Sequence, residues 1–178
     1  MLINLLLTLI LLFIIFLCFL GVYFFVKLMI YRVPFVPTPK KVAKKMIELA
    51  DIKSKQKIYD LGCGGGIILF EAEKKYPDNK FCGYEVLRPA VIFANTKKIF
   101  KKSKINFKCQ DFFAADLSDA DVIFCYLFPS IMEKFYEKKF STLKKGTKII
   151  SHGFKIKNLQ YKKKVVLNKA KIWIYEKS

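Results

Sequence analysis

The sequence is 178 residues long, which suits one domain with an appendage rather than two full domains. Its formal net charge of +19 favours anionic partners such as phospholipid headgroups, nucleic acid or acidic proteins, although lysine enrichment without a dedicated role explains the same charge. One histidine and five cysteines without a Cys-x-x-Cys pair argue against a metal site, and they fit a reduced compartment better than a disulfide scaffold.

The first 26 residues form an uncharged run dominated by Leu, Ile and Phe. About 20 apolar residues in a helix can cross a bilayer core, so we expect a transmembrane anchor over residues 1–31. A cleaved signal peptide is the alternative, but the run lacks a preceding basic residue and a small-x-small cleavage site. Basic residues follow the run, which predicts a single-pass membrane protein with the rest of the chain on the cytoplasmic side.

Residues 32–39 form a stiff proline-rich connector, because Pro34, Pro37 and Pro39 prevent a continuous helix. Thr38 is expected to cap the next helix, with Pro39 at its first position. Apolar residues then recur at helical spacing from Val42 to Ala50. We expect the folded domain to occupy residues 40–178.

Strands and helices alternate through the rest of the chain. Strands are expected at 57–61, 80–86, 105–110, 121–127 and 147–151, with helices following the first, second and fourth strands, the last of them over 130–143. Two further runs, 164–167 and 172–175, flank a short turn and predict a closing antiparallel hairpin. This alternation indicates a mostly parallel sheet that is covered on both faces.

A glycine-rich loop joins the first of these strands to its helix, in the segment Asp60-Leu61-Gly62-Cys63-Gly64-Gly65-Gly66. Glycines permit positive φ and a close approach of the backbone to a ligand, and free N–H groups at a helix start favour anionic groups. Glu85 ends the second strand, where an acidic side chain can accept hydrogen bonds from two ribose hydroxyls. Together these features predict a nucleoside-containing cofactor.

The glycine segment resembles the first motif of class I S-adenosylmethionine (SAM)-dependent methyltransferases, and Glu85 matches their second-strand acid. The resemblance implies a Rossmann-like α/β sheet with helices on both faces, here preceded by one transmembrane helix. It further implies that Asp111 lies near the exocyclic amine of adenine and Phe112 beside the ring. A dinucleotide dehydrogenase, the alternative within this fold, prefers G-x-G-x-x-G to the G-x-G-x-G found here. The implied SAM-binding residues are Asp60, Gly62, Cys63, Gly64, Gly66, Glu85, Asp111 and Phe112.

A narrower resemblance covers the apolar run, the connector, the glycine motif and the segment Val122–Pro129. These parts together resemble the membrane-anchored protein-lysine methyltransferases of the ATP synthase c-subunit and the adenine nucleotide translocase. In that family the proline-rich connector closes over the cofactor pocket, which implies that Pro37 and Thr38 also bind the cofactor. It likewise implies that Tyr126 and Pro129 are catalytic. Leu127 and Phe128 are bulky here, in contrast to the family pattern.

The resulting expectation is a protein-lysine N-methyltransferase that acts on membrane or membrane-proximal proteins. A small-molecule or lipid methyltransferase and a non-catalytic SAM-binding membrane module are the alternatives. Base-modifying amino-methyltransferases carry Asp/Asn-Pro-Pro-Tyr/Phe where this chain has Tyr126-Leu127-Phe128-Pro129, which argues against nucleic-acid substrates. Aromatic side chains at Phe112, Tyr126 and Phe128 either hold a cation or pack in the core. His152, after the fifth strand, either contacts substrate or is structural.

Overall fold

The computed structural model describes residues 2–31 and 37–178; residues 1 and 32–36, which include most of the predicted connector, lie outside this description. The chain divides into two units, Met1–Val36 and Pro37–Ser178. The first unit contains helix α1 (Leu2–Tyr31). Its stretch Ile3–Val26 has a mean hydropathy of 3.2 and no buried residue, which suits a membrane span or a signal sequence.

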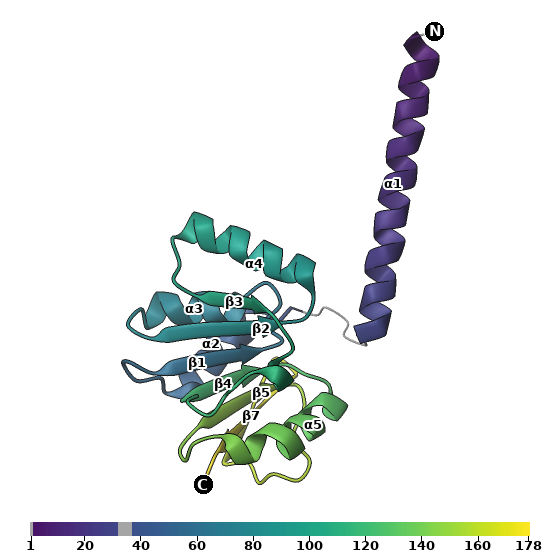
Figure 1. Cartoon of the computed structure of the whole chain (residues 1–178). Coiled ribbons are helices and arrows are strands. Elements are labelled where there is room, and N and C mark those ends of the chain that lie inside the picture. The colour runs from purple at the N-terminus through teal and green to yellow at the C-terminus, as the bar shows by residue number, and fades with distance from the viewer. Residues whose placement is uncertain (1, 32–36) are drawn as a thin grey trace. The chain divides into compact units, whose positions relative to one another are not determined.

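The second unit is built around a seven-stranded sheet with the order β3-β2-β1-β4-β5-β7-β6 (Figure 1). The strands are β1 (Lys57–Leu61), β2 (Lys80–Glu85), β3 (Asn106–Cys109), β4 (Val122–Cys125), β5 (Lys148–His152), β6 (Lys163–Leu167) and β7 (Ala170–Glu176). Strands β1 to β5 pair in parallel, and β7 pairs antiparallel with both β5 and β6. The predicted parallel sheet and closing hairpin are therefore confirmed.

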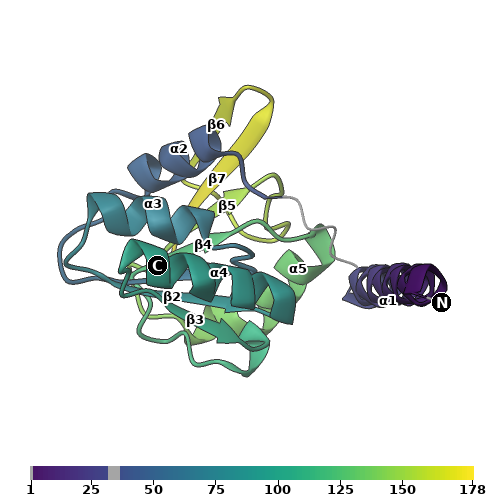
Figure 2. The same ribbon diagram turned by 90° about the horizontal axis from the view of Figure 1, so that it is seen from above.

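Helices cover both faces of the sheet, as predicted. On one face lie α2 (Lys40–Ala50), α3 (Ile67–Lys75) and α4 (Arg88–Lys101), side by side when seen from above (Figure 2). On the other face lie α5 (Pro129–Lys139) and two short 3-10 helices, Phe112–Ala114 and Phe140–Thr142. The expected helix over 130–143 is thus shorter, because its last turn tightens into the second of these 3-10 helices.

Two hydrophobic cores, one on each side of the sheet, hold this arrangement together. Met46, Leu69 and Val91 of α2, α3 and α4 pack on one face, whereas Met132 and Phe135 of α5 pack on the other. Strand β4 contributes to both cores, because alternate side chains of a strand point to opposite faces. All four of its residues are buried, as expected for a central parallel strand.

The start of α2 differs from the sequence prediction. Pro39, not Thr38, is the N-cap residue, and its carbonyl accepts a hydrogen bond from the Ala43 N–H at 2.9 Å. No side chain caps this helix, and Thr38 lies one residue earlier as a buried residue. The prediction that Thr38 caps α2 is therefore wrong, since the helix begins one residue later than its sequence pattern suggested.

Candidate active site

The candidate site lies at the carboxyl ends of the parallel strands. The strand order reverses between β1 and β4, and ligands of open α/β sheets bind at such a switch point. The loop after β1 and the segment after β4 meet there. A Cβ atom at Gly62 would lie only 2.9 Å from the Cδ2 atom of Leu127. The fold therefore places the glycine loop beside the predicted catalytic segment.

The glycine loop has the backbone conformation that its sequence predicts. Gly62, Gly64 and Gly66 have φ values of +74°, +50° and +73°, a region that side chains with a Cβ rarely adopt. The loop is anchored to β2, because the N–H groups of Gly62 and Cys63 both donate to the Tyr84 carbonyl, at 2.9 and 3.0 Å. Gly66 is the N-cap residue of α3. The loop thus leads directly into a helix N-terminus, a place suited to polar or anionic ligand groups.

Glu85 lies at the end of β2, and its side chain connects this strand end to the glycine loop that follows β1. Its Oε2 atom accepts a hydrogen bond from the Gly64 N–H at 3.0 Å. Its Oε1 atom accepts from the N–H groups of Val86 and Leu87, at 2.8 and 2.9 Å. A carboxylate can accept about four hydrogen bonds, so about one position remains for a ligand hydroxyl. Accepting two ribose hydroxyls, as predicted, would therefore require the bond from Gly64 to be released.

Asp60 lies beside Glu85 and is more deeply buried, with 3% of its surface exposed. Burial and, secondarily, the charge of Glu85 raise the pKa of Asp60 to about 8. No ion pair of residues 37–178 includes either acid. A cationic ligand would offset the cost of these two buried acids. The site therefore fits SAM, which carries a sulfonium, an ammonium and two ribose hydroxyls.

The side chain of Cys63 is buried. A Cβ atom at Gly83 would lie 2.6 Å from the Cys63 Sγ atom, so the thiol packs against β2. Burial, followed by the charges of Asp60 and Glu85, raises the pKa of the Cys63 thiol. The thiol is therefore neutral, and any contribution of Cys63 to cofactor binding would come from its backbone.

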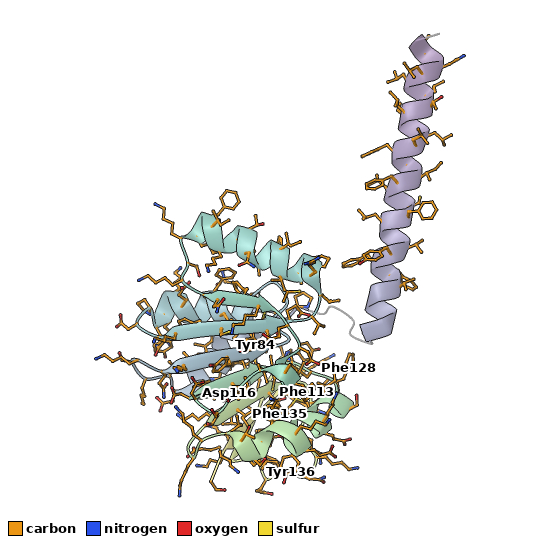
Figure 3. All side chains as sticks on the ribbon, viewed as in Figure 1. Tyr84, Phe113, Asp116, Phe128, Phe135 and Tyr136 are labelled. Atoms are coloured by element: carbon orange, nitrogen blue, oxygen red, sulfur yellow. The ribbon has the colours of Figure 1, made fainter. Side chains whose placement is uncertain are left out.

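The residues after β3 lie next to Glu85, because the Gln110 N–H donates to the Glu85 carbonyl at 3.0 Å. Asp111 is exposed, and its Oδ1 atom accepts from the Phe113 N–H at 2.9 Å. Phe112 is buried, and the centroid of its ring lies 4.3 Å from that of Phe113 and 6.4 Å from that of Phe135. Figure 3 shows Phe113 and Phe135 on the side of the sheet that carries α5. The adenine-binding roles of Asp111 and Phe112 remain predictions.

An aromatic cluster lies at the carboxyl ends of β4 and β5, and we define it as Tyr126, Phe128, His152 and Phe154. The ring centroid of Tyr126 is 4.1 Å from that of His152 and 6.4 Å from that of Phe154. The rings of Phe128 and Phe154 are 6.1 Å apart, and Figure 3 places Phe128 near the start of α5. Tyr126, Phe128 and Phe154 are only partly buried, so the cluster forms part of a surface.

Within this cluster, His152 carries an unusual buried atom. Its Nδ1 atom has no hydrogen-bond partner in the described parts of the chain. Burial lowers the pKa of His152, so the imidazole is uncharged near neutral pH. Gly153 makes the close packing possible, because it has a φ of +82° and a Cβ there would lie 2.9 Å from the Tyr126 ring. Sequence reasoning missed Phe154; its signal is an aromatic residue two positions after a strand end.

The remaining predicted site residues lie at the margins of this arrangement. Pro129 is exposed at the first position of α5, directly after Phe128. Pro37 is exposed and Thr38 is buried, and within residues 37–178 no hydrogen bond joins either of them to the glycine loop. The described residues hold no group of three or more His, Cys, Asp or Glu side chains able to bind a metal ion. The roles of Pro37, Thr38 and Pro129 stay predictions.

Comparison with known proteins places these features in a family. The family model described as the ANTKMT methyltransferase domain matches residues 60–163, which include every predicted site residue except Pro37 and Thr38. A protein-lysine N-methyltransferase of Saccharolobus islandicus is 35% identical over 130 residues, covering 71% of this chain and 80% of its own length.

Solved methyltransferase structures are also similar to this chain. An RNA methyltransferase from Salinibacter ruber in complex with S-adenosyl-L-homocysteine is 31% identical, with a TM-score of 0.76 over 80% of this chain and 94% of its own. A ribosomal protein L11 methylase from Lactobacillus delbrueckii subsp. bulgaricus, 18% identical, has a TM-score of 0.65 over 76% of this chain and 77% of its own, which shows the shared fold alone. The chain therefore belongs to the ANTKMT methyltransferase domain family and is a class I SAM-dependent methyltransferase.

Proposed function

We propose that the chain is a protein-lysine N-methyltransferase that acts on membrane or membrane-proximal proteins. The observation that carries this proposal is the 35% identity to a protein-lysine N-methyltransferase over 71% of the chain. The apolar helix α1, none of whose residues from Ile3 to Val26 is buried, supports a single-pass anchor. The basic residues that follow it support a catalytic domain on the cytoplasmic side.

The geometry of the strand ends supports the cofactor-binding roles that we propose. SAM, when bound, supplies an electrophilic methyl group on its sulfonium. In our proposal Glu85 holds the ribose hydroxyls, Asp60 faces the cationic methionine end, and the Gly62–Gly66 backbone packs against it. The segment after β3, with Asp111 and Phe112, flanks the adenine. Pro37 and Thr38 close over this pocket from the connector.

The aromatic cluster then receives the acceptor lysine. An amine can attack a methyl group only when it is neutral, and lysine has a reference pKa of ~10.4. Partly buried rings of Tyr126, Phe128 and Phe154 withdraw the amine from water, which lowers its pKa. The uncharged imidazole of His152 adds no positive charge beside it. Pro129 fixes the start of α5 and with it the position of this wall. Most of the rate enhancement then comes from aligning the amine with the methyl group.

RNA is the competing acceptor, because the similar Salinibacter protein is described as an RNA methyltransferase. The segment Tyr126-Leu127-Phe128-Pro129 weighs against it, since it offers no Asp or Asn side chain to hold the amino group of a base. A lipid or another small molecule is the second competitor. A module that binds SAM without transferring its methyl group is the third.

One experiment separates these functions. The full chain is reconstituted into vesicles prepared from total membranes, incubated with methyl-labelled SAM in the presence of total RNA, and the products are fractionated. We expect label in protein bands, and in methyllysine after acid hydrolysis. Label confined to the organic extract or to RNA would contradict the proposal, as would tight SAM binding without transfer. The Glu85→Gln variant is the matched control, and it should bind SAM at least about tenfold more weakly, a loss of ~1.4 kcal/mol.

A further inference from the structure

Helix α4 carries a row of exposed apolar side chains that the methyltransferase site does not use. Ile92, Phe93, Ile99 and Phe100 are 60%, 56%, 76% and 84% exposed. Only two residues of the helix, Val91 and Ala94, are buried against the sheet. Monomeric soluble domains rarely expose several large apolar residues in one place, so this row calls for a partner. We refer to these four residues as the α4 apolar face.

The four residues form one continuous strip on the side of α4 that points away from the sheet. Ile92 and Ile99 are seven residues apart, as are Phe93 and Phe100, and a spacing of seven brings residues to the same side of a helix. At 3.6 residues per turn the strip spans about 120° of the circumference and lies opposite Val91 and Ala94. Figure 1 shows α4 beside β3 and β2, at one end of the sheet.

Positive charge surrounds this strip. Helix α4 contains Arg88, Lys97, Lys98 and Lys101 but no acidic residue, and Lys102 and Lys104 follow it directly. None of the ion pairs found in the described chain includes any of these cations. A helix with exposed Phe and Ile side chains, flanked by cations that form no ion pair in the described chain, is typical of segments that lie in the interface of an anionic membrane.

We propose that the α4 apolar face inserts into the surface of an anionic phospholipid bilayer and seats the methyltransferase domain on it. The inference rests on the proposed membrane attachment, because α1 would already hold the domain close to a bilayer. A lipid surface fits better than RNA, since half of the strip, Ile92 and Ile99, is aliphatic and offers bases no ring to stack on. It also fits better than a second copy of the chain, whose α4 would present the same unpaired positive charges.

Docking at this face would reach the cofactor loop. The Lys97 Nζ atom donates to the Gly65 carbonyl at 3.3 Å and lies 5.0 Å from the centre of the Phe93 ring. A Cβ atom at Gly65 would lie 3.2 Å from that ring. Phe93 therefore contacts both the proposed lipid surface and the glycine loop. We expect SAM affinity to depend on anionic lipid for this reason.

A tryptophan placed on the strip tests the proposal in the full chain. The Phe100→Trp variant is reconstituted into vesicles of phosphatidylglycerol and dibrominated phosphatidylcholine, and its emission is compared with that of the parent chain, whose own Trp173 is buried. We expect bromine to quench the added emission about twofold or more, as for a ring inserted roughly 5–10 Å into the interface. The Val166→Trp variant is the matched control, because Val166 is 58% exposed on strand β6, and it should not be quenched.

A charge variant tests the role of the cations. Arg88→Glu and Lys101→Glu, both at exposed positions of α4 and added to Phe100→Trp, should abolish the quenching while circular dichroism stays unchanged. Quenching of Phe100→Trp no stronger than that of Val166→Trp would overturn the proposal. A blue shift that depends on protein concentration but not on bromine would overturn it in favour of a second copy. A shift produced only by added RNA would overturn it in favour of nucleic acid.

The anchor is scored separately in the same vesicles. Resistance of the chain to alkaline carbonate extraction reports insertion of α1, whereas quenching reports the α4 apolar face. If carbonate extracts the chain although its tryptophan is quenched, α1 is not a membrane anchor, but the α4 apolar face still binds lipid. If the chain resists extraction and its tryptophan is not quenched, α1 is an anchor and the proposal for the α4 apolar face is overturned.

Discussion

At the scale of single residues, the two buried acids of the site carry the largest electrostatic cost. Asp60 and Glu85 are 3% and 7% exposed, and they are the buried acids of the described chain. Glu85 is compensated by three backbone N–H groups, from Gly64, Val86 and Leu87. The carboxyl group of Asp60 has no hydrogen bond within residues 37–178, and its pKa is accordingly raised to about 8. Burial without a compensating donor therefore favours the protonated form of Asp60 in the folded chain at neutral pH.

The raised pKa of Asp60 makes stability fall as pH rises. Below the reference pKa of 3.8 the carboxyl group is protonated in both the folded and the unfolded chain, so it causes no pH dependence. Between that value and about 8 only the unfolded chain loses the proton, and the free energy of unfolding falls by about 1.4 kcal/mol per pH unit. Asp60→Asn should remove this slope. Urea unfolding of the full chain in detergent at several pH values measures it.

The control for this prediction is Asp111→Asn, because Asp111 is an exposed acid of the same site. It should keep the slope of the parent chain. If the free energy of unfolding has the same pH dependence in the parent and in Asp60→Asn between pH 5 and 8, Asp60 is not protonated in the folded chain.

The sequence predicts which residues lie at the ends of the strands, but it does not predict their hydrogen-bond and packing partners. The spacing of Asp60, the glycines and Glu85 predicts a cofactor-binding loop from the sequence alone. The three hydrogen bonds that Glu85 accepts depend on how the loop and the start of α4 fold over the strand end, which no local pattern encodes. The same holds for His152 and Phe154. His152 and Phe154 come 26 and 28 residues after Tyr126 in the chain, so their contacts with its ring are long-range.

At the scale of elements, Gly66 controls the junction between the cofactor loop and α3. It has a φ of +73°, and a Cβ atom there would lie 2.5 Å from the Cζ atom of Phe107 and 2.6 Å from its Cε1 atom. Phe107 belongs to β3 and is itself buried, so it has little room to move. The residue type at this position is therefore fixed by packing as well as by backbone conformation.

Gly66→Ala should destabilise the chain far more than the matched change Gly146→Ala. Gly146 has a φ of +84° but open space around its Cβ position, so alanine there meets only the left-handed backbone cost of about 1–2 kcal/mol. Alanine at position 66 adds overpacking of about 1–3 kcal/mol. Thermal unfolding and SAM titration of both variants measure the effect. Equal losses of stability would show that backbone strain, rather than Phe107, governs this position.

The types and order of the elements were predictable, whereas two properties of helices were not. The one-residue error at the start of α2 arose because Thr and Pro are both common at helix starts, and only backbone geometry tells which of them caps. The sequence also did not predict which side of α4 is exposed. Its apolar residues occur on both the inner side, at Val91, and the outer side, at Phe100, and periodicity alone cannot say which side meets the sheet.

At the scale of the whole molecule, the break in composition at Lys27 separates two parts with different roles. Every core residue belongs to the unit Pro37–Ser178, and the stretch Ile3–Val26 of α1 contributes none. The sequence predicts an anchor over residues 1–31, a connector over 32–39 and a folded domain over 40–178, and these bounds stay predictions. The methyltransferase domain therefore contains its own stabilising interactions.

A chain that begins at Pro37 should consequently keep its fold and its SAM affinity, within about twofold of the full chain. Its activity on a membrane-embedded lysine should fall by roughly a hundredfold or more, because the tether supplies a high effective concentration of substrate. Activity on a soluble peptide with the same lysine should not change, since the pocket is intact. Calorimetric titration with SAM and methyl transfer to the two substrates measure these effects side by side.

Replacing α1 with an unrelated apolar helix of equal length should restore the membrane activity. Loss of SAM binding in the shortened chain would instead show that residues before Pro37 take part in the cofactor pocket.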